Sequence, residues 1–452
     1  MTLWGGRFEE PPADSLWRFT VDDSDRRLLA DDVAGSLAHA SVLGEAGLLS
    51  TEEAALIRSG LEQVRDEAES GSFVFVPTDE DVHTAVERRL GELVGAVSGK
   101  LHMGRSRNDQ VALDVRLYLR RAAGARIDQL RRLIGVLVDA AVASGETVVP
   151  SFTHLQQAQA VPFAHHLLAH AWAIVRDVQR FAAVRVRLDV SPLGAGASGG
   201  SSLPLRPYDT ARLLDFADLF DNSLDAVAAR DVVTEYAFCC AQAMTTLSRL
   251  AEELVLWGTE EFGWATFDDR FTTGSSALPH KKNPDVAELV RGKAAAVAGD
   301  VSTLLALQKG LPLSYNRDLQ EDKRAVFHAD DSLGGACEAL SGMVETAWFH
   351  PPDPSPWVTA LDLAEVLVQR GVPFREAHEA VGGLVAALNN AGRTFADVSA
   401  GELEAAHPQL VPEDMDRLSP RGSVDARATP GGGSSSSVAR QIDRLRRLLD
   451  GG

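Results

Sequence analysis

The strongest constraint on the fold is the helical spacing of apolar residues in the middle of the sequence, from about residue 111 to residue 345. One helix face collects Ile127, Leu130, Ile134, Leu137, Val138 and Ala141. Another collects Met244, Leu247, Leu250, Ala251 and Leu254. The intervening positions carry arginine, glutamate and glutamine, which is typical of helices with one buried face. Because segments this long cannot hide their apolar faces in a small domain, the pattern predicts helices packed side by side, within and between subunits.

Composition excludes several functional classes. A formal net charge of -20 over 452 residues, with no basic stripe, argues against a nucleic-acid partner. The sequence has no uncharged apolar run of roughly 18 residues, and its start lacks a basic and then apolar signal segment. Its three cysteines include two adjacent ones, Cys239 and Cys240, so a disulfide framework is not expected. We therefore expect a cytoplasmic protein with no membrane partner, and an anionic substrate would need a local cationic pocket.

Shorter helical patterns flank the middle region. They cover residues 31–43 and 51–67 on one side, with Ser50 or Thr51 as an N-cap, and residues 361–370, 374–389 and 438–449 on the other. A proline-rich run at residues 351–356 marks a boundary, and the Gly/Ser-rich residues 429–437 look like a linker. We predict an all-α chain with an N-terminal helical domain (1–104), a central helical-bundle domain (105–350) and a C-terminal helical domain (351–452).

A polar loop at residues 273–285 precedes a helical pattern at residues 286–307. Its glycine, serines and prolines disfavour both helix and strand, and Asp285 after Pro284 sits where a helix can begin. The loop therefore collects hydroxyls, two ammonium groups, an amide and the free N–H groups of a helix N-terminus. Such a set suits an oxyanion or a carboxylate. A flexible linker explains the composition equally well.

Four other polar features interrupt the helical patterns. Arg105–Gln110 groups arginines and an amide before a long helix, which is also typical of a solvated turn. Residues 151–159 place His154 at a break between helices, where a histidine is more often structural than catalytic. Residues 191–205 form a glycine-rich loop without a Walker lysine. His166 and His170 have the spacing of a helical metal pair, but with no obvious third ligand we predict no metal site.

These stretches resemble the fumarase/aspartase superfamily and, within it, the argininosuccinate lyase family. Loop 273–285 is similar to the superfamily's signature loop, and residues 102–110 resemble that family's His-Thr-Gly-Arg-Ser-Arg-Asn-Asp-Gln stretch. Residues 310–323 match the lyases almost residue for residue, and the likeness runs from about Leu3 to Leu449. It implies a fumarase/aspartase-like fold with a long central helical bundle flanked by two smaller helical domains. It also implies a homotetramer with each active site built from three subunits, and no cofactor.

The resemblance implies the chemistry as well. The family cleaves argininosuccinate reversibly to arginine and fumarate as a C–N lyase of the amidine-lyase class, the last step of arginine biosynthesis. By this likeness Ser275 is the base, Lys281 stabilises the intermediate, and His154, oriented by Glu288, serves the leaving nitrogen. The substrate-binding positions that match are Asp25, Arg107, Asn108, Thr153, Asn283, Tyr315, Arg317, Gln320 and Lys323.

Several positions depart from the family pattern and leave the amine half of the substrate open. Val21 stands where the lyases usually carry serine, Met103 replaces threonine, and Ser198 replaces leucine. His280 replaces glutamine and is the residue found in adenylosuccinate lyases. The alternative is thus a related lyase that releases fumarate from a different N-succinyl adduct, of adenylosuccinate type or with an amine of specialised metabolism. A non-catalytic relative is disfavoured because the predicted catalytic residues are all retained.

Overall fold

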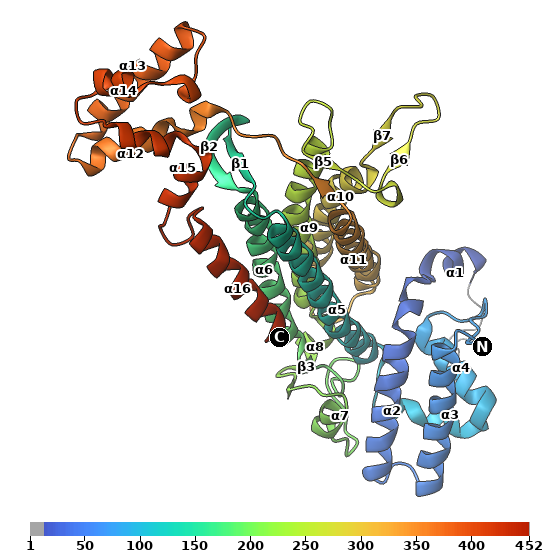
Figure 1. Cartoon of the computed structure of the whole chain (residues 1–452). Coiled ribbons are helices and arrows are strands. Elements are labelled where there is room, and N and C mark those ends of the chain that lie inside the picture. The colour runs from blue at the N-terminus through green and yellow to red at the C-terminus, as the bar shows by residue number, and fades with distance from the viewer. Residues whose placement is uncertain (1–12, 452) are drawn as a thin grey trace. The chain divides into compact units, whose positions relative to one another are not determined.

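The computed structural model describes residues 13–451 and is built almost entirely from α-helices (Figure 1). The predictions on the first residues therefore lie outside the described part. The helices are α1 (Asp14–Thr20), α2 (Leu29–Glu45), α3 (Thr51–Glu69), α4 (Val82–Val94), α5 (Arg107–Ala143), α6 (Phe163–Leu188), α7 (Pro207–Leu213), α8 (Ser223–Ala228), α9 (Asp231–Trp257), α10 (Asp285–Gln308), α11 (Asp322–Glu345), α12 (Ala360–Gln369), α13 (Phe374–Asn390), α14 (Ala400–Ala406), α15 (Pro420–Ala426) and α16 (Ser435–Asp450).

Strands in this described part are short and pair only in twos. The antiparallel pairs are β1 (Val148–Thr153) with β2 (Gln156–Pro162), β5 (Ala265–Thr266) with β8 (Trp348–Phe349), and β6 (Thr273–Gly274) with β7 (Lys282–Asn283); β3 (Val190–Ser191) and β4 (Asp218–Leu219) run parallel. No helix among residues 13–451 is both long and apolar enough to cross a membrane.

The chain divides into two compact units. Unit 1 consists of the residues up to Arg126 with Arg180–Ala241 and Ala296–Ser332, and unit 2 of Ile127–Gln179, Gln242–Ala295 and the residues from Leu333 onward. Each unit thus contains a part of each of the long helices α5, α6, α9, α10 and α11. The three-domain division expected from composition remains a prediction.

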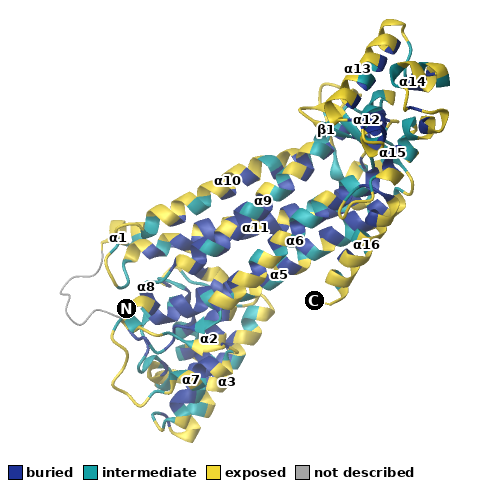
Figure 2. Cartoon of the chain, turned by 90° about the vertical axis from the view of Figure 1, so that its left-hand side faces the viewer, coloured by how far each residue is buried: buried dark blue, intermediate teal, exposed yellow. Residues whose placement is uncertain are grey.

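In unit 1, helices α2, α3 and α4 pack together around an apolar core. Ile57, Leu61 and Leu90 are completely buried there, and Figure 2 shows α2 and α3 with buried inner faces and exposed outer faces. Helix α3 begins as predicted, because the Ser50 hydroxyl accepts the Glu53 N–H at 3.2 Å while the Glu53 carboxylate accepts the Ser50 N–H at 3.1 Å. This capping box pairs two N–H groups that a helix start leaves without partners.

Buried polar groups join the long helices of unit 1. The Asp330 carboxylate on α11 accepts hydrogen bonds from the Tyr118 hydroxyl on α5 at 2.7 Å and from the Tyr236 hydroxyl on α9 at 2.5 Å. All three side chains are buried. Since a buried polar group without a partner is costly, these bonds fix how the three helix segments pack.

In unit 2, a β-hairpin stands where the sequence suggested a simple break between helices. Strands β1 and β2 pair from Val148 with Pro162 to Thr153 with Gln156, and the register shifts between Pro150 and Phe152. The β-branched valines favour a strand, whereas proline cannot donate to the ladder, so the irregularity falls beside Pro150. Helix α6 follows directly, starting at Phe163.

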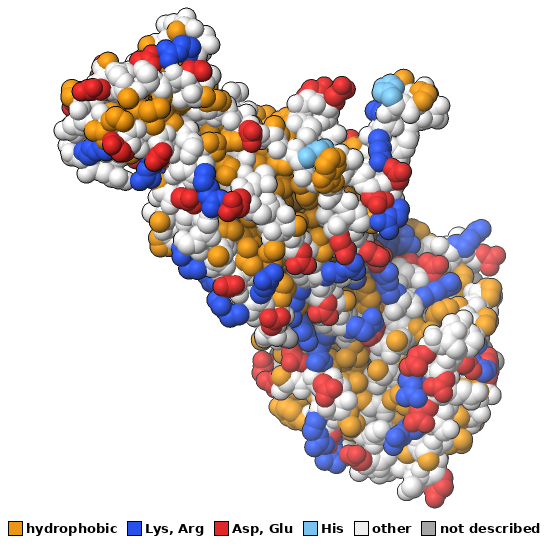
Figure 3. All heavy atoms as spheres, viewed as in Figure 1, with side chains coloured by type: hydrophobic (Ala, Val, Ile, Leu, Met, Phe, Trp, Pro, Cys, Tyr) orange, Lys and Arg blue, Asp and Glu red, His pale blue; other side chains and the backbone are white. Residues whose placement is uncertain are grey.

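The polar loop of residues 273–285 is also a hairpin, which corrects the expectation that it forms no strand. Thr273 pairs with Asn283 and Gly274 with Lys282, and helix α10 begins at Asp285 as predicted. Figure 1 shows the hairpin extending away from the neighbouring helices, and Figure 3 shows its tip standing clear of the surrounding surface. The unpaired part of the loop is thus limited to the residues between β6 and β7.

The C-terminal part of unit 2 has its own apolar core between α12, α13 and α14, with Leu363, Leu367 and Leu403 completely buried. Helices α12 and α13 match the predicted segments within one residue. The expected linker is partly helical, because α16 begins at Ser435 and the Ser434 hydroxyl accepts the Ser437 N–H at its start. The serine run therefore caps a helix, a role that serine favours.

Candidate active site

A cavity of about 410 Å³ lies in unit 1 where three separate stretches of sequence meet. The first stretch is residues 22–25. The second is residues 80–111, which contain the starts of α4 and α5, and the third is residues 315–323. Its lining residues are Asp22, Ser24, Asp25, Glu80, Asp81, His83, Thr84, His102, Ser106, Arg107, Asn108, Val111, Tyr315, Arg317, Gln320 and Lys323. Most of these side chains are polar or charged, so the cavity suits a small charged ligand better than an apolar one.

The cavity brings together most of the substrate-binding residues predicted from the sequence. Those that line it are Asp25, Arg107, Asn108, Tyr315, Arg317, Gln320 and Lys323. They span almost 300 positions of sequence, so their gathering is a property of the fold and not of local spacing. Thr153 and Asn283, the other two predicted binding residues, belong to unit 2.

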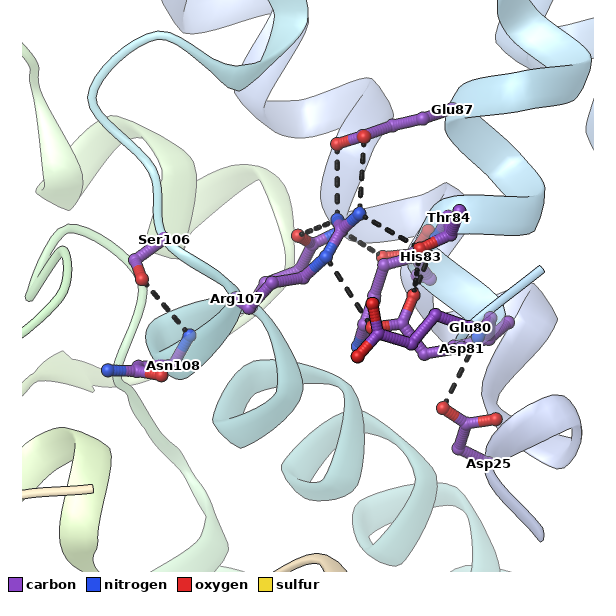
Figure 4. A network of polar contacts seen from close by, with 12 residues as sticks. Asp25, Glu80, Asp81, His83, Thr84, Glu87, Ser106, Arg107 and Asn108 are labelled. Atoms are coloured by element: carbon purple, nitrogen blue, oxygen red, sulfur yellow. Dashed lines mark hydrogen bonds and ion pairs between the residues drawn. The ribbon is translucent and has the colours of Figure 1, made fainter. Parts of the chain in front are cut away.

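Arg107 is the centre of a hydrogen-bonded network (Figure 4). Its guanidinium donates to both carboxylate oxygens of Glu87 at 3.1 and 3.2 Å, and it lies 3.5 Å from an Asp81 oxygen. Burial would raise the pKa of Glu87, but hydrogen bonds from His102 and Arg107 outweigh it and lower that pKa to about 2. The ionised carboxylates fix the position of the guanidinium, which is then oriented before a ligand arrives.

The residues after Arg107 hold the glycine-rich loop in place. The Asn108 amide donates to the Ala197 carbonyl at 2.9 Å. One Asp109 carboxylate oxygen accepts the N–H groups of Gly194 at 3.0 Å and Gly196 at 2.8 Å. Gly196 has a positive φ of 59°, and a Cβ there would lie 2.8 Å from a backbone oxygen, so only glycine fits. The start of α5 thus positions this loop.

Asp25 lines the cavity, and one oxygen of its carboxylate is buried without a hydrogen-bond partner in the described part of the chain. One oxygen accepts the Val82 N–H at 3.2 Å, whereas Oδ1 is buried and, in the described part of the chain, has no hydrogen-bond partner. Burial raises the pKa of Asp25 to about 6 despite the nearby His83 and Lys323. An unpartnered buried carboxylate oxygen is the place for a ligand cation, which would supply the missing hydrogen bond.

The third stretch supplies cations and amides. The Arg317 guanidinium donates to the Thr20 carbonyl at 3.0 Å and pairs with Glu80 at 3.3 Å, and the Gln320 amide donates to the same carbonyl at 3.0 Å. The Lys323 ammonium is buried and lies 2.9 Å from an Asp322 oxygen. The two bonds to the Thr20 carbonyl fix Arg317 and Gln320 relative to the segment that continues to Asp22 and Asp25.

Charges of both signs therefore line the same cavity. Asp22, Asp25, Glu80 and Asp81 are acidic, whereas Arg107, Arg317 and Lys323 are basic. Several of these charges already pair within the protein, as Arg107 does with Glu87 and Arg317 with Glu80. The arrangement suits a zwitterion, with an ammonium toward Asp25 and a carboxylate toward the guanidinium and ammonium groups.

Sequence reasoning missed several lining residues, namely Asp22, Ser24, Glu80, Asp81, His83 and Thr84. In the structure the Asp81 carboxylate accepts the Thr84 N–H at 2.6 Å and so caps the start of α4. His83 is buried with Nδ1 2.9 Å from an Asp32 oxygen and 3.4 Å from an Asp114 oxygen, and such long-range pairing leaves no local sequence signal.

The predicted catalytic residues of the signature loop belong to unit 2. Ser275 lies directly after β6, and its hydroxyl oxygen accepts backbone N–H groups from Ala277 at 3.3 Å and Leu278 at 3.0 Å. Lys281 is exposed, and Asn283 is held in β7 opposite Thr273. Two N–H donors aimed at one serine oxygen stabilise negative charge on it, as in an oxyanion hole.

The other predicted catalytic residues lie on different elements of unit 2. Thr153 ends β1, and exposed His154 occupies the hairpin turn with a positive φ of 55°. Glu288, on the first turn of α10, lies 3.9 Å from Arg291. Among the contacts of the described chain, His154 and Glu288 form no hydrogen bond or ion pair with each other. One chain alone thus brings together the cavity residues but not the predicted His154–Glu288 pair.

Two family models match the chain. A model described as lyase matches residues 6–299, and a model described as argininosuccinate lyase C-terminal matches residues 357–425. Curated proteins named argininosuccinate lyase are similar over the whole length. That of Cutibacterium acnes is 47% identical and the alignment covers 100% of this chain and 98% of the relative. That of Frankia casuarinae is 48% identical with the same coverage.

Solved structures share the fold. An EDDS lyase in complex with formate superposes with a TM-score of 0.82 at 30% identity, covering 96% of this chain and 88% of that one. A class II fumarase from Schistosoma mansoni gives a TM-score of 0.74 at 16% identity, covering 90% of this chain and 92% of that one. The all-α fold with a helical bundle is thus the fold of the fumarate lyase superfamily, as the sequence predicted.

Proposed function

Because this chain belongs to the argininosuccinate lyase family, we propose that it is a C–N lyase that splits argininosuccinate reversibly into arginine and fumarate. Its biological place would be the last step of arginine biosynthesis. The reaction removes a proton next to a carboxylate and expels a guanidinium nitrogen from the neighbouring carbon.

The observation that carries this proposal is the unit 1 cavity, which gathers seven of the nine predicted substrate-binding residues. Argininosuccinate has an amino-acid end with one ammonium and one carboxylate, and the cavity is lined by charges of both signs. Asp25 has an unpartnered oxygen for the ammonium. Arg317 and Lys323 supply cations for the carboxylate, and Arg107 and Asn108 complete the site. The cavity therefore supports recognition of an amino acid instead of a simple dicarboxylate.

For the proton removal we propose Ser275 as the base. The difficulty of this step is that a carbanion pushes charge into a carboxylate that is already negative. The N–H groups of Ala277 and Leu278 stabilise the serine oxygen as it becomes an alkoxide. Lys281 and Asn283 would stabilise the charge on the substrate, because cations and amides fixed in a water-poor site lower the cost of developing charge.

The pairing of His154 with Glu288 is proposed to form between subunits of a homotetramer. Both side chains are exposed, and within the described chain they have no contact with each other. Helix α10 supports association, because one face carries exposed Leu289, Gly292, Ala296, Gly299, Thr303 and Ala306. Small residues on an exposed helix face let another helix approach closely, and Leu289 is 61% exposed. The interfaces of this tetramer and a cytoplasmic location remain predictions.

The test of the activity is direct. Purified protein is mixed separately with argininosuccinate, adenylosuccinate and aspartate, and fumarate is followed by its ultraviolet absorbance. We expect fumarate from argininosuccinate only. Release from adenylosuccinate alone, or from none of the three, would refute the proposal and favour an adduct with another amine. Relatives of nearly half identity over the full length support argininosuccinate.

A further inference from the structure

Three side chains of unit 2 converge outside the residues used for catalysis. His166 and His170 lie one turn apart on α6, and Glu253 lies on α9. The Nε2 atoms of the histidines are 2.6 Å and 2.7 Å from the same Glu253 oxygen, Oε2. The ligand atoms of all three residues lie within 4.8 Å of one another. The third ligand that the sequence did not reveal is therefore present.

We propose that His166, His170 and Glu253 form a binding site for a divalent transition-metal ion such as Zn²⁺, which joins α6 to α9. Two imidazoles and one carboxylate are a common ligand set for such ions, with water completing the coordination. A tetrahedral Zn²⁺ with bonds of roughly 2.0–2.1 Å separates its ligand atoms by about 3.3 Å. Binding would therefore require the Nε2–Oε2 separations to widen from 2.6 and 2.7 Å to about that value.

The packing around the histidines orients them. The His166 ring meets the Trp257 ring edge-on with centroids 5.3 Å apart, and Phe163 packs beside it at 6.5 Å. The His166 and His170 rings themselves are 5.9 Å apart. Aromatic packing of this kind limits the rotation of the ring, so the Nε2 atom stays directed at the carboxylate.

At 2.6 Å and 2.7 Å the two contacts are hydrogen bonds, so a bound ion would replace them with bonds from the same three ligand atoms. Two N–H donors beside a carboxylate can each bond to a different oxygen, whereas here both histidine Nε2 atoms contact the same oxygen, Oε2. Binding of an ion needs only the imidazole tautomers with hydrogen on Nδ1, which free both Nε2 lone pairs. The side chains are 19%, 13% and 33% exposed, so solvent reaches the ion and fills its open positions.

The position also indicates the role of the ion. Ser275, His154 and Glu288 are on other elements, and none of them supplies an atom to this cluster. The proposed ion therefore crosslinks two helices of the bundle and contributes stability, because an ion that binds only the folded state stabilises it by mass action.

Cobalt titration tests the site on the full-length protein, freed of any affinity tag and treated with a chelator. Co²⁺ absorbs in the visible range when imidazole and carboxylate ligands replace its water, and Zn²⁺ competes for the same site. We expect one Co²⁺ per chain and a rise in the melting temperature with either ion. Glu253→Gln and His170→Asn should each weaken binding at least about 100-fold, since even changes of outer-sphere partners cost 10- to 100-fold.

Matched controls lie next to each ligand. His165→Asn changes a histidine bonded to Gln441, and Glu252→Gln changes a carboxylate paired with Arg291, so both variants should bind Co²⁺ like the parent. If Glu253→Gln does not fold, His166→Asn replaces it. The proposal is overturned if the parent binds no stoichiometric Co²⁺, or if the cluster and control variants bind it equally well.

Discussion

Replacing Asp25 by asparagine tests the role of the unit 1 cavity. The variant keeps the shape of the side chain and the acceptor for the Val82 N–H, which lies at 3.2 Å, but removes the charge. A hydrogen bond to a charged group contributes about 1.5–3 kcal/mol. If Asp25 binds the substrate ammonium, Asp25→Asn should raise KM for argininosuccinate by roughly 10- to 150-fold.

The same substitution should stabilise the free protein, with a defined pH dependence. Burial raises the pKa of Asp25 from 3.8 to about 6, so the folded state holds this proton more tightly than the unfolded state. The ionised carboxylate therefore lowers the free energy of unfolding as pH rises through about 6. From the two pKa values this loss is about 1.6 kcal/mol at pH 5 and about 3 kcal/mol at pH 8. The free energy of unfolding of Asp25→Asn should therefore exceed that of the parent by more at pH 8 than at pH 5.

Steady-state kinetics at pH 8 measures the change in KM. Urea unfolding at pH 5 and pH 8, at one protein concentration, measures the change in the free energy of unfolding. Asp23→Asn is the matched control, because its carboxylate is 70% exposed and it lies only two positions before Asp25 in sequence. An unchanged KM would show that Asp25 does not contact the substrate. A stability difference that is equal at both pH values would refute the raised pKa.

Four further substitutions test the remaining assignments. Ser275→Ala should lower kcat by at least about 100-fold with an unchanged melting temperature, whereas near-normal turnover would remove Ser275 as the base. His154→Asn and Glu288→Gln should each lower kcat, and the fold-loss of kcat in the double variant should be far smaller than the product of the two single fold-losses. A double loss equal to that product would show that the two residues do not act as a pair. Val21→Ser should lower KM about two- to tenfold by adding one hydrogen bond, and argininosuccinate activity that is absent in the parent and not restored by serine would favour another adduct.

The helices and their starts were predictable because their signals are local. Ser50 and Glu53 are three positions apart and form the expected capping box, and α12 and α13 match the expected segments. The loop before α10 also ends where Asp285 indicated. Such features depend on hydrogen bonds and apolar faces within a few turns of chain.

The missed features depend on contacts between distant positions. Glu253 is 87 residues from His166, and Asp32 is 51 residues from His83, so neither partner has a sequence signal. The two hairpins were missed because strands this short gain their stability from pairing and not from composition. Family resemblance supplied seven of the sixteen cavity residues, but Asp22, Glu80 and Asp81 were recognised only from the structure.

The division into two units has a consequence for how such enzymes diverge. The predicted substrate-binding residues that line the cavity, from Asp25 to Lys323, belong to unit 1, whereas the four predicted catalytic residues belong to unit 2, as do Thr153 and Asn283. Mutations that change the preferred amine can therefore accumulate in one set of segments while the other remains intact. A lineage can in this way acquire a new succinyl adduct through intermediates that still make fumarate, and Val21 is a position where that drift would begin.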